Sequence, residues 1–408
     1  MLPVTEAQAI VLEHTRPLPP RDVLLSAAAL GLVLAKDVAS DIDMPPFDKA
    51  LMDGYAVRGQ DLQEGRGVLH VIEEITAGQT PQLALAAGQA ARIMTGAPIP
   101  QGADAVIVVE RTRLLDGNRV QIDDKPPRPG QNILGRAREM RRGETVLRAG
   151  AVLQPQHFGV LATVGRGSVA VHPAPEVAIL PTGDEIVEVT ETPRPGQIRN
   201  GNSFLLLAQV ARAGGVPRQL GIAPDRLDAL RALAARGLDS DVLVLSGGVS
   251  AGKLDLVPGV LQELGVKAHF HKVEMKPGKP LFFGTRDKTL VFGLPGNPVS
   301  SLVCFELFVR PALGKLKALA DPGPHLVQAE LVEDFPHKTD RPTYHPAVLT
   351  SGQDGWQVRP VPWFGSSDLR GLLPANAFVL LPAGEHQHRA GQRFPVLVAD
   401  MEAVSFAH

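Results

Sequence analysis

The sequence predicts a multidomain α/β protein in which a doubly wound, mostly parallel α/β domain is joined to two β-rich regions. Residues 176–318 alternate short apolar strands with helices of about 10–15 residues, which is typical of a parallel sheet covered on both faces. Residues 40–140 and 323–408 instead contain short β-like runs between Gly, Pro, Asp and Asn turns. A chain of 408 residues is also too long for one compact core.

These changes in composition and expected secondary structure along the chain predict four domains. A linking domain is expected to begin with a helix over residues 5–14 that Thr5 caps, and to be completed by a segment that returns after the inserted β-rich domain. The last domain is expected to be a small β-barrel-like fold, with a sandwich as the alternative. The predicted boundaries are 1–40 with 141–175 for the linking domain, 41–140 for the inserted domain, 176–322 for the α/β domain and 323–408 for the C-terminal domain.

Within the α/β region the elements follow one another in a regular order. One helix is expected to have Pro224 at its start and Gly237 at its end. The expected strands are 176–180, 216–223, 241–245 and 289–294, and the expected helices are 202–215, 224–237, 254–265 and 299–317. The expected strands of the C-terminal domain are 325–332, 343–349, 356–361, 377–383 and 394–399.

Composition excludes several classes of function. The 41 basic and 43 acidic residues give a net charge of -2, and the chain has two Trp and two Tyr, so nucleic acid is not an expected partner. Cys304 is the one cysteine, which rules out an internal disulfide and a thiolate zinc site. The longest apolar stretch, 23–35, is too short to span a bilayer, and the N-terminus does not resemble a signal peptide. We therefore expect a cytoplasmic protein with no membrane segment.

Candidate ligand-binding residues gather where the predicted parallel strands end, because ligands of doubly wound sheets bind outside the carboxyl ends of the strands. Carboxylates, glycines and hydroxyls follow four of the strands, and the segment 275–280 adds two lysines. Backbone N–H groups and lysines suit a phosphate-bearing ligand, and carboxylates suit a divalent cation beside it. The candidates are Thr182, Gly183, Asp184, Glu185, Asp225, Ser246, Gly247, Gly248, Ser250, Asp255, Lys276, Lys279, Pro295, Gly296, Asn297, Pro298 and Ser300.

One of these loops, SGGVSAGKLD at 246–255, is close to a nucleotide-binding P-loop. The residue after its lysine is Leu254, where that motif needs a Ser or Thr hydroxyl to hold Mg²⁺. We therefore expect a loop that holds another anionic ligand. Each feature also has a purely structural interpretation, since glycines are common at strand–helix junctions and Asp184 and Asp225 could cap helices.

Six motifs, in this order and spacing, resemble the molybdopterin molybdenumtransferases of the MoeA and gephyrin E-domain type. They are FDKALMDGYAV, RIMTGAPIPQGADAVIVVE, PTGDEI, SGGVSAGKLD, MKPGKPLFFG and GLPGNPVSSLVCFELFVRPAL, and they cover about residues 1–320. The resemblance implies an enzyme that inserts molybdate into adenylylated molybdopterin with release of AMP, assisted by Mg²⁺ or another divalent cation. It also implies an elongated homodimer with a shared active site, and it permits a transient contact with the molybdopterin adenylyltransferase.

The resemblance assigns roles to particular residues. Asp53 and Thr95 match the acidic residue of MDGYA and the threonine of TGAP, and Lys276 and Lys279 match the lysines of KPGKP. The implied catalytic residues are Asp53, Thr95, Glu185, Asp225, Asp255, Lys276 and Lys279, and the implied metal ligands are Glu185, Asp225 and Asp255. Ser366 and Ser367 fall where the family often has serines in its last domain.

The chain departs from the family pattern in three places. Lys49-Ala50-Leu51 precedes MDGYA in place of the usual Asn-Ser-Ala, and Lys253 stands where many members have an acidic residue. Leu134-Gly135 occupies positions where arginines are common. Two alternatives to the insertase are a scaffolding protein on the same fold and a molybdopterin adenylyltransferase.

Overall fold

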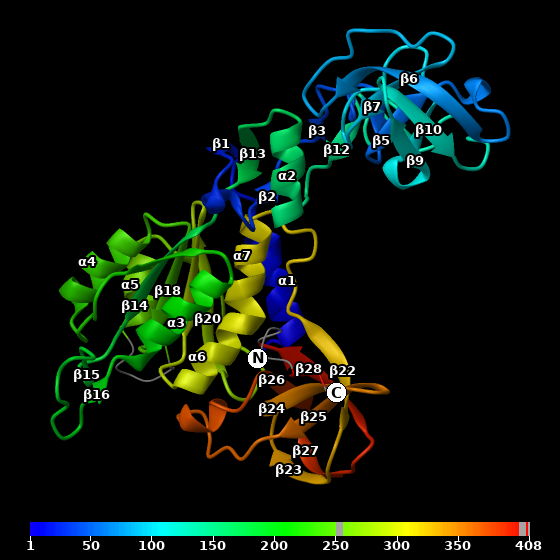
Figure 1. Cartoon of the computed structure of the whole chain (residues 1–408). Coiled ribbons are helices and arrows are strands. Elements are labelled where there is room, and N and C mark those ends of the chain that lie inside the picture. The colour runs from blue at the N-terminus through cyan, green and yellow to red at the C-terminus, as the bar shows by residue number, and fades with distance from the viewer. Residues whose placement is uncertain (250–255, 400–404, 407–408) are drawn as a thin grey trace. The chain divides into compact units, whose positions relative to one another are not determined.

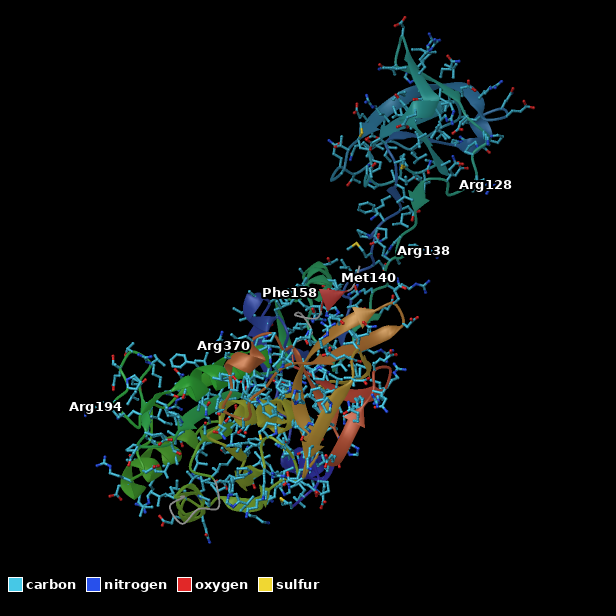
Figure 2. All side chains as sticks on the ribbon, turned by 90° about the horizontal axis from the view of Figure 1, so that it is seen from below. Arg128, Arg138, Met140, Phe158, Arg194 and Arg370 are labelled. Atoms are coloured by element: carbon cyan, nitrogen blue, oxygen red, sulfur yellow. The ribbon has the colours of Figure 1, made fainter. Side chains whose placement is uncertain are left out.

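The computed structural model describes residues 1–249, 256–399 and 405–406, and the chain forms two compact units. The first unit contains Met1–Val23, Ala29–Ala35 and Ala170–His408, and the second contains Leu24–Ala28 and Lys36–Val169. Charged side chains extend from the outside of both units, as Arg194 and Arg370 of the first and Arg128 of the second show (Figure 2). In the part of the chain that is described, no helix is long and apolar enough to cross a membrane.

The centre of the first unit is a six-stranded sheet (Figure 1). The three pairings β17–β14, β14–β18 and β18–β21 are parallel, and the pairings of β20 with β21 and with β19 are antiparallel. The strands, in sheet order, are β17 (Val216–Gln219), β14 (Glu176–Pro181), β18 (Val242–Ser246), β21 (Thr289–Leu294), β20 (Pro280–Arg286) and β19 (Lys267–Lys272). This confirms the doubly wound, mostly parallel α/β fold.

Alternate residues of the central strands pack on opposite faces of this sheet, because side chains of a strand alternate in direction. Val177 and Ile179 belong to the core beneath one group of helices, whereas Ala178 and Leu180 belong to the core beneath the other. The first group is α3 (Gly201–Arg212), α6 (Pro298–Cys304), the π-helical turn Phe305–Val309 and α7 (Arg310–Leu316), joined by α1 (Val4–His14). The second group is α4 (Leu227–Gly237) and α5 (Val257–Glu263).

The sequence did not predict the strands β19 and β20, and the helices of the α/β region differ from the sequence-based expectations in three details. Helix α1 begins at Val4, and its N-cap is Pro3 without a side-chain hydrogen bond, so Thr5 is not the cap. Helix α4 begins at Leu227, which leaves Pro224 in the preceding loop. The last long helix contains the π-helical turn Phe305–Val309, which ends two residues before Pro311, a residue that has no N–H for regular α-helical bonding.

The C-terminal region is a closed five-stranded barrel, which confirms the expected barrel-like fold. Its strands pair in the cyclic order β25–β22–β28–β26–β24, and the additional pairing of β24 with β25 closes the ring. The ranges are β22 (Leu326–Leu331), β24 (Thr343–Gly352), β25 (Gly355–Pro360), β26 (Ala377–Leu381) and β28 (Arg393–Val398). A separate two-stranded sheet of β23 (Phe335–Thr339) and β27 (Gly384–His388) was not expected from the sequence.

The N-terminal elements of the first unit also include a short pairing with the returning chain. In this pairing β13 (Ser168–His172) is antiparallel to β2 (Val33–Leu34), with Val171 opposite Leu34. In the second unit, β12 (Thr145–Leu147) pairs with β3 (Val38–Ala39) in the same antiparallel sense.

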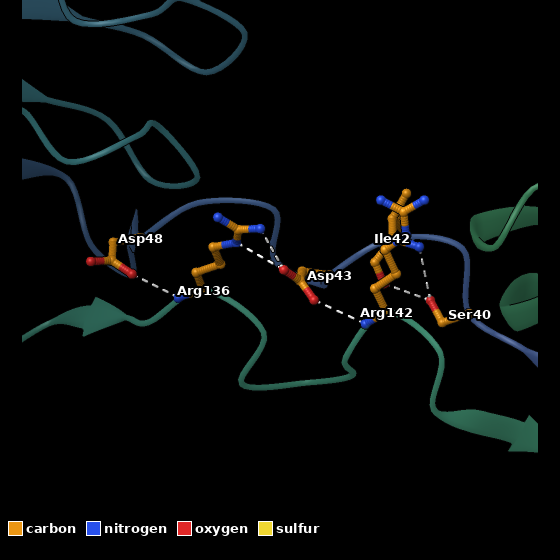
Figure 3. A network of polar contacts seen from close by, with 6 residues as sticks. All are labelled: Ser40, Ile42, Asp43, Asp48, Arg136 and Arg142. Carbon is orange, nitrogen blue, oxygen red and sulfur yellow. Dashed lines mark hydrogen bonds and ion pairs between the residues drawn. The ribbon is translucent and has the colours of Figure 1, made fainter.

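The second unit is built on a six-stranded sheet with two small cores, one on each side. Its order is β8 (Ala105–Val108), β5 (Gly54–Val57), β7 (Gln89–Ile93), β6 (Arg66–Ile75), β10 (Arg119–Asp123) and β9 (Thr112–Leu115). Two segments of the chain, 40–48 and 136–142, lie side by side (Figure 3). They are joined by Asp43, which accepts Arg136 Nε at 2.8 Å and the Arg142 N–H at 2.9 Å.

Candidate functional site

Two cavities of about 600 Å³ each open beside the carboxyl ends of the parallel strands. The strand-end cavity is lined by residues that follow β14, β17, β18 and β21, and the lysine cavity lies between the α/β sheet and the C-terminal barrel. The two cavities share Pro280, Pro295 and Asn297, so they adjoin. The lining of the strand-end cavity includes Thr182, Gly183, Glu185, Asn202, Asp225, Ser246, Gly247, Gly248, Pro295, Gly296, Asn297 and Pro298.

The glycines of the loop after β18 are required by the close approach of the loop after β14. Gly247 and Gly248 both have positive φ, at +93° and +63°. A Cβ atom on Gly247 would lie 2.6 Å from the Thr182 carbonyl oxygen, and one on Gly248 would lie 2.7 Å from Thr182 Oγ1. Thr182 Oγ1 is buried and finds no hydrogen-bond partner among the residues described. The two loops therefore leave a buried hydroxyl and backbone without side chains at the edge of the cavity.

Among the residues that the structure describes, two carboxylates line the strand-end cavity, namely Glu185 and Asp225. Asp184 does not line it, and instead its Oδ1 accepts the Asp225 N–H at 3.0 Å, which holds the two loops together. Neither aspartate supplies a helix cap, since α4 begins at Leu227 without a side-chain cap. Two other predicted residues, Ser250 and Asp255, lie outside the described residues. Within the described ones, no group of three His, Cys, Asp or Glu side chains forms a metal cluster.

Asn202, at the start of α3, connects three loops of the strand-end cavity and was not predicted from the sequence. Its Nδ2 donates to Ser246 Oγ at 2.8 Å and to the Gly296 carbonyl at 2.7 Å. This places the end of β18 and the turn after β21 in a fixed relation to the helix. Amides are frequent at helix starts as caps, so the sequence carried no signal for this long-range role.

The lysine cavity is strongly basic. Lys276, Lys279 and Arg341 line it, and no carboxylate belongs to its lining in the described structure. The other polar and aromatic lining residues are Asn297, Ser300, His337, Thr343, His345, Trp363 and Ser366. The sequence did not predict Arg341, the two histidines or Trp363 as lining residues, because they belong to no motif in the β-rich tail.

Ser366, one of the two serines suggested for the last domain, fastens the C-terminal barrel to the turn after β21. Asn297 Nδ2 donates to Ser366 Oγ at 2.8 Å, and the Val299 N–H donates to the Ser366 carbonyl at 3.0 Å. Ser367 does not line either cavity. The Lys276 backbone makes a second link, because it exchanges hydrogen bonds with Pro342 and Tyr344 of the barrel region.

Burial and positive charge keep the histidines of the lysine cavity neutral. Burial, followed by the nearby His345 and Lys276, lowers the pKa of His337 to about 4. Burial also lowers the pKa of His345, whose Nε2 is bonded to the Val361 carbonyl at 3.0 Å. The positive charge of the cavity at neutral pH therefore comes from its two lysines and its arginine.

Asp53 and Thr95, in the second unit, form one compact pair. Asp53 Oδ1 accepts both the backbone N–H and the hydroxyl of Thr95, each at 2.7 Å. These two hydrogen bonds from Thr95 lower the pKa of Asp53. Gly54, the next residue, is held against the neighbouring strand, where an added Cβ would overlap the Ile107 carbonyl. The aspartate is thus fixed in direction and kept ionised.

Comparisons with known proteins agree with this architecture. Three family models match successive parts of the chain: "MoeA N-terminal region (domain I and II)" over residues 2–165, "Probable molybdopterin binding domain" over 178–315 and "MoeA C-terminal region (domain IV)" over 328–399. The chain is 36% identical to the molybdopterin molybdenumtransferase of Bacillus subtilis (strain 168), over 91% of this chain and 88% of that protein.

Two further matches cover at least the same share of the chain. The molybdopterin molybdenumtransferase of Nostoc sp. (strain PCC 7120 / SAG 25.82 / UTEX 2576) is 37% identical over 91% of this chain and 87% of its own length. The crystal structure of the molybdopterin biosynthesis moea protein from Pyrococcus horikosii superposes with a TM-score of 0.82 and 32% identity, covering 98% of this chain and 99% of that one. The motifs, the fold and these matches together show that the chain belongs to the molybdopterin molybdenumtransferase (MoeA) family.

Proposed function

We propose that this chain is a molybdenum insertase, which transfers molybdenum from molybdate to adenylylated molybdopterin and releases AMP. The observation that carries the proposal is the pair of adjoining cavities, which differ in charge and share Asn297. The strand-end cavity offers glycine-rich backbone and carboxylates to a phosphate-bearing ligand. The charged side chains that line the lysine cavity in the described ranges are Lys276, Lys279 and Arg341, which suit an oxyanion. The names of the matching relatives and domain, molybdopterin molybdenumtransferase and probable molybdopterin binding domain, support a pterin and a molybdenum oxyanion as the two ligands.

In the strand-end cavity, the loops after β14 and β18 are proposed to hold the phosphoanhydride of the pterin nucleotide. Backbone N–H groups near Gly247 and Gly248 can donate to phosphate oxygens. Thr182 Oγ1, which has no hydrogen-bond partner among the described residues, is buried beside Gly248. Asn202 holds the end of β18 and the turn after β21 in place through its two hydrogen bonds. Attack of water on one phosphorus of the phosphoanhydride then breaks the bond from that phosphorus to the bridging oxygen. One of the two resulting phosphates, AMP or the terminal phosphate of molybdopterin, takes the water oxygen, the other keeps the bridging oxygen, and the protons of the water pass to phosphate oxygens or to solvent.

The carboxylates of this cavity fit a divalent cation. Mg²⁺ is usually held by one or two carboxylates together with substrate phosphates, and Glu185 and Asp225 provide two. Asp255 is proposed as a third ligand from the sequence. When bound, Mg²⁺ supplies positive charge against the developing negative charge of the leaving phosphate. Asp184 fixes the loop that carries Asp225.

In the lysine cavity, Lys276, Lys279 and Arg341 are proposed to bind molybdate. Charge-assisted hydrogen bonds from ammonium and guanidinium groups are the strong contacts for such an oxyanion. The cavity lies beside the strand-end cavity, so a bound molybdate would be near the dithiolene of the pterin. The two dithiolene thiols lose their protons as their sulfurs bond to molybdenum, and one oxygen atom of molybdate takes up both protons and leaves as water.

Asp53 and Thr95 are proposed to act in the same reaction, in a homodimer in which one subunit's second unit serves the site of the other. The observation that supports this role is that the Asp53 carboxylate is held in a fixed direction and kept ionised by Thr95. Ser300 and Ser366 complete the proposed oxyanion site. We place the reaction in the cytoplasm, with the adenylyltransferase as a transient partner that delivers the nucleotide.

The test is to incubate the protein with adenylylated molybdopterin and Mg²⁺, with and without molybdate, and to measure AMP. The proposal expects AMP release that requires molybdate. AMP release without molybdate, or consumption of ATP to form the nucleotide, would contradict it and favour another activity of the pathway.

A further inference from the structure

Phe364 is a large aromatic side chain at the mouth of the lysine cavity that the proposed reaction does not use. The residue belongs to the lining of this cavity, beside Gly365 and Ser366, and it is 94% exposed. Among the phenylalanines whose burial is described, the next most exposed, Phe204, is 46% exposed. Packing within the described chain therefore gives the Phe364 ring no role.

The preceding residue, Trp363, is packed into the fold. Its ring is partly buried against the main core of the first unit and contacts His345 edge-on, with ring centroids 5.4 Å apart. Trp363 thus holds this part of the chain on the barrel. Of two neighbouring aromatic residues at one cavity, one stabilises the fold and the other, Phe364, is left exposed to solvent.

The backbone around Phe364 is fixed at several points. Asp368 closes the loop, because its Oδ2 accepts the Phe364 N–H at 3.2 Å and its Oδ1 accepts the Gly371 N–H at 3.0 Å. Ser366 joins the loop to the turn after β21 through one side-chain and one backbone hydrogen bond. Gly365 has a φ of +120°, a conformation that favours glycine. A ring on such a fixed loop loses less conformational entropy when it meets a ligand.

The proposed substrate has one part that the polar groups of the two cavities do not bind, the flat pterin ring. The diphosphate is proposed to lie in the strand-end cavity, and the dithiolene beside Lys276 and Lys279 in the lysine cavity. The dithiolene of molybdopterin belongs to a ring fused to the pterin, so both are expected at the same cavity. Flat heteroaromatic rings bind to aromatic side chains by stacking and by burying apolar area.

A structural interpretation of Phe364 is that single exposed apolar residues are common on protein surfaces. Leu373, nine positions later, is 83% exposed and lines neither of the two cavities, so exposure alone does not indicate a ligand. Phe364 differs from Leu373 in three ways: it is aromatic, it belongs to the cavity lining, and its N–H is held by Asp368.

We propose that Phe364 stacks on the pterin ring of adenylylated molybdopterin and so positions the dithiolene beside the lysines of the lysine cavity. The identity of the ring rests on the proposed function. Phe364 makes and breaks no bond in the reaction, and its role is to bind and orient the substrate.

The experiment measures the binding of adenylylated molybdopterin and of AMP to the full-length protein, by ultrafiltration without molybdate. Phe364→Ala is expected to bind the pterin nucleotide at least about fivefold more weakly, the loss that follows removal of an aromatic ring stacked on a base. Phe364→Tyr keeps the ring and is expected to bind as the unsubstituted protein does. AMP has no pterin, so its binding is expected to be equal in all variants. Leu373→Ala is the matched control and should retain both affinities.

The proposal is overturned if Phe364→Ala binds the pterin nucleotide as tightly as the unsubstituted protein, which would leave the ring to contacts with another protein. An equal loss of AMP binding in Phe364→Ala would also overturn it, in favour of stacking on adenine. The same loss in Leu373→Ala would overturn it as an effect of the exposed loop.

Molybdate-dependent AMP release, measured in parallel, separates this proposal from the proposed function. Phe364-dependent binding of the pterin nucleotide without such AMP release would support the stacking and contradict the insertase. AMP release that requires molybdate, together with unchanged binding in Phe364→Ala, would do the reverse. If the unsubstituted protein does not bind the pterin nucleotide, both proposals are contradicted.

Discussion

Thr95 directs two donors, its backbone N–H and its hydroxyl, at the same carboxylate oxygen of Asp53. The pair joins the MDGYA turn to the TGAP turn, 42 residues later in the chain. Hydrogen bonds to the ionised form of a carboxylate favour that form, so the threonine sets the charge of the aspartate as well as its direction.

Thr95→Val tests this relationship. The variant keeps the backbone hydrogen bond and loses the hydroxyl bond, so we expect the pKa of Asp53 to rise toward its ordinary value. If ionised Asp53 serves the reaction, the acidic limb of the pH–rate profile moves to higher pH. Thr95→Ser, which retains a hydroxyl, is the control and should behave like the unsubstituted protein. An acidic limb that is identical in all three proteins would show that this hydroxyl does not control the charge.

The loop glycines give a second prediction, in which two Gly→Ala variants act in opposite directions. Gly248→Ala places a Cβ 2.7 Å from Thr182 Oγ1 at a φ of +63°, so we expect it to lower the free energy of unfolding by about 1–3 kcal/mol and to weaken nucleotide binding. Gly259→Ala, inside α5 with open space around it, should raise that free energy by roughly 0.5–1 kcal/mol. Urea unfolding of both variants checks the pair, and equal effects would refute the steric argument.

Asn202 provides a third prediction about how the cavity loops are held. Asn202→Ala removes both hydrogen bonds to the loops after β18 and β21, so we expect a loss of about 1–2 kcal/mol in stability and a higher KM for the nucleotide. Ser246→Ala removes the acceptor of only one of these bonds and should have a smaller effect on KM. We expect steady-state kinetics to give the highest KM for the nucleotide in Asn202→Ala, an intermediate KM in Ser246→Ala and the lowest KM in the unsubstituted protein. A reversed order would mean that Ser246 acts on the ligand directly.

The lowered pKa of His337 predicts how the stability of the C-terminal region depends on pH. The pKa of His337 is about 4 in the folded protein, below the ordinary value of 6.5, so below pH 6.5 the unfolded chain binds a proton that the folded chain does not. Stability should therefore fall as pH drops from about 6.5 to about 4 and then level off for this group. His337→Asn should flatten the dependence.

Both tryptophans of the chain, Trp356 and Trp363, lie in the C-terminal region, so their fluorescence reports on this part of the fold. Urea midpoints at pH 7 and pH 5, for the unsubstituted protein and His337→Asn, are the measurement. If the urea midpoint falls by the same amount between pH 7 and pH 5 in both proteins, groups other than His337 cause the pH dependence.

Much of the fold could be predicted from the sequence because the hydrophobic pattern and the turns agree with it. The strands β14, β18 and β21 are continuous apolar runs, as expected for strands buried on both faces. The antiparallel edge strand β19 was missed since its sequence, KAHFHK, is mostly polar, which is typical of an exposed edge. The four domain boundaries stay a prediction.

The candidate site could be predicted only where residues form local motifs. Thr182, Glu185 and Gly247 follow buried strands, and the topology alone brings them to one edge. Asn202 and Arg341 reach the cavities through contacts between segments far apart in sequence, and no local pattern marks such residues. Asp184 shows the opposite case, since a motif residue beside the cavity supports a loop instead of lining it.

The central claim is that the lysine cavity supplies molybdate to a nucleotide held in the strand-end cavity. It is tested most directly by molybdate-dependent AMP release from adenylylated molybdopterin, measured for the unsubstituted protein and for the double variant Lys276→Met, Lys279→Met. The account predicts that the double variant still binds the nucleotide but needs at least about tenfold more molybdate, because two charge-assisted contacts are lost. An unchanged molybdate requirement in the double variant would contradict it.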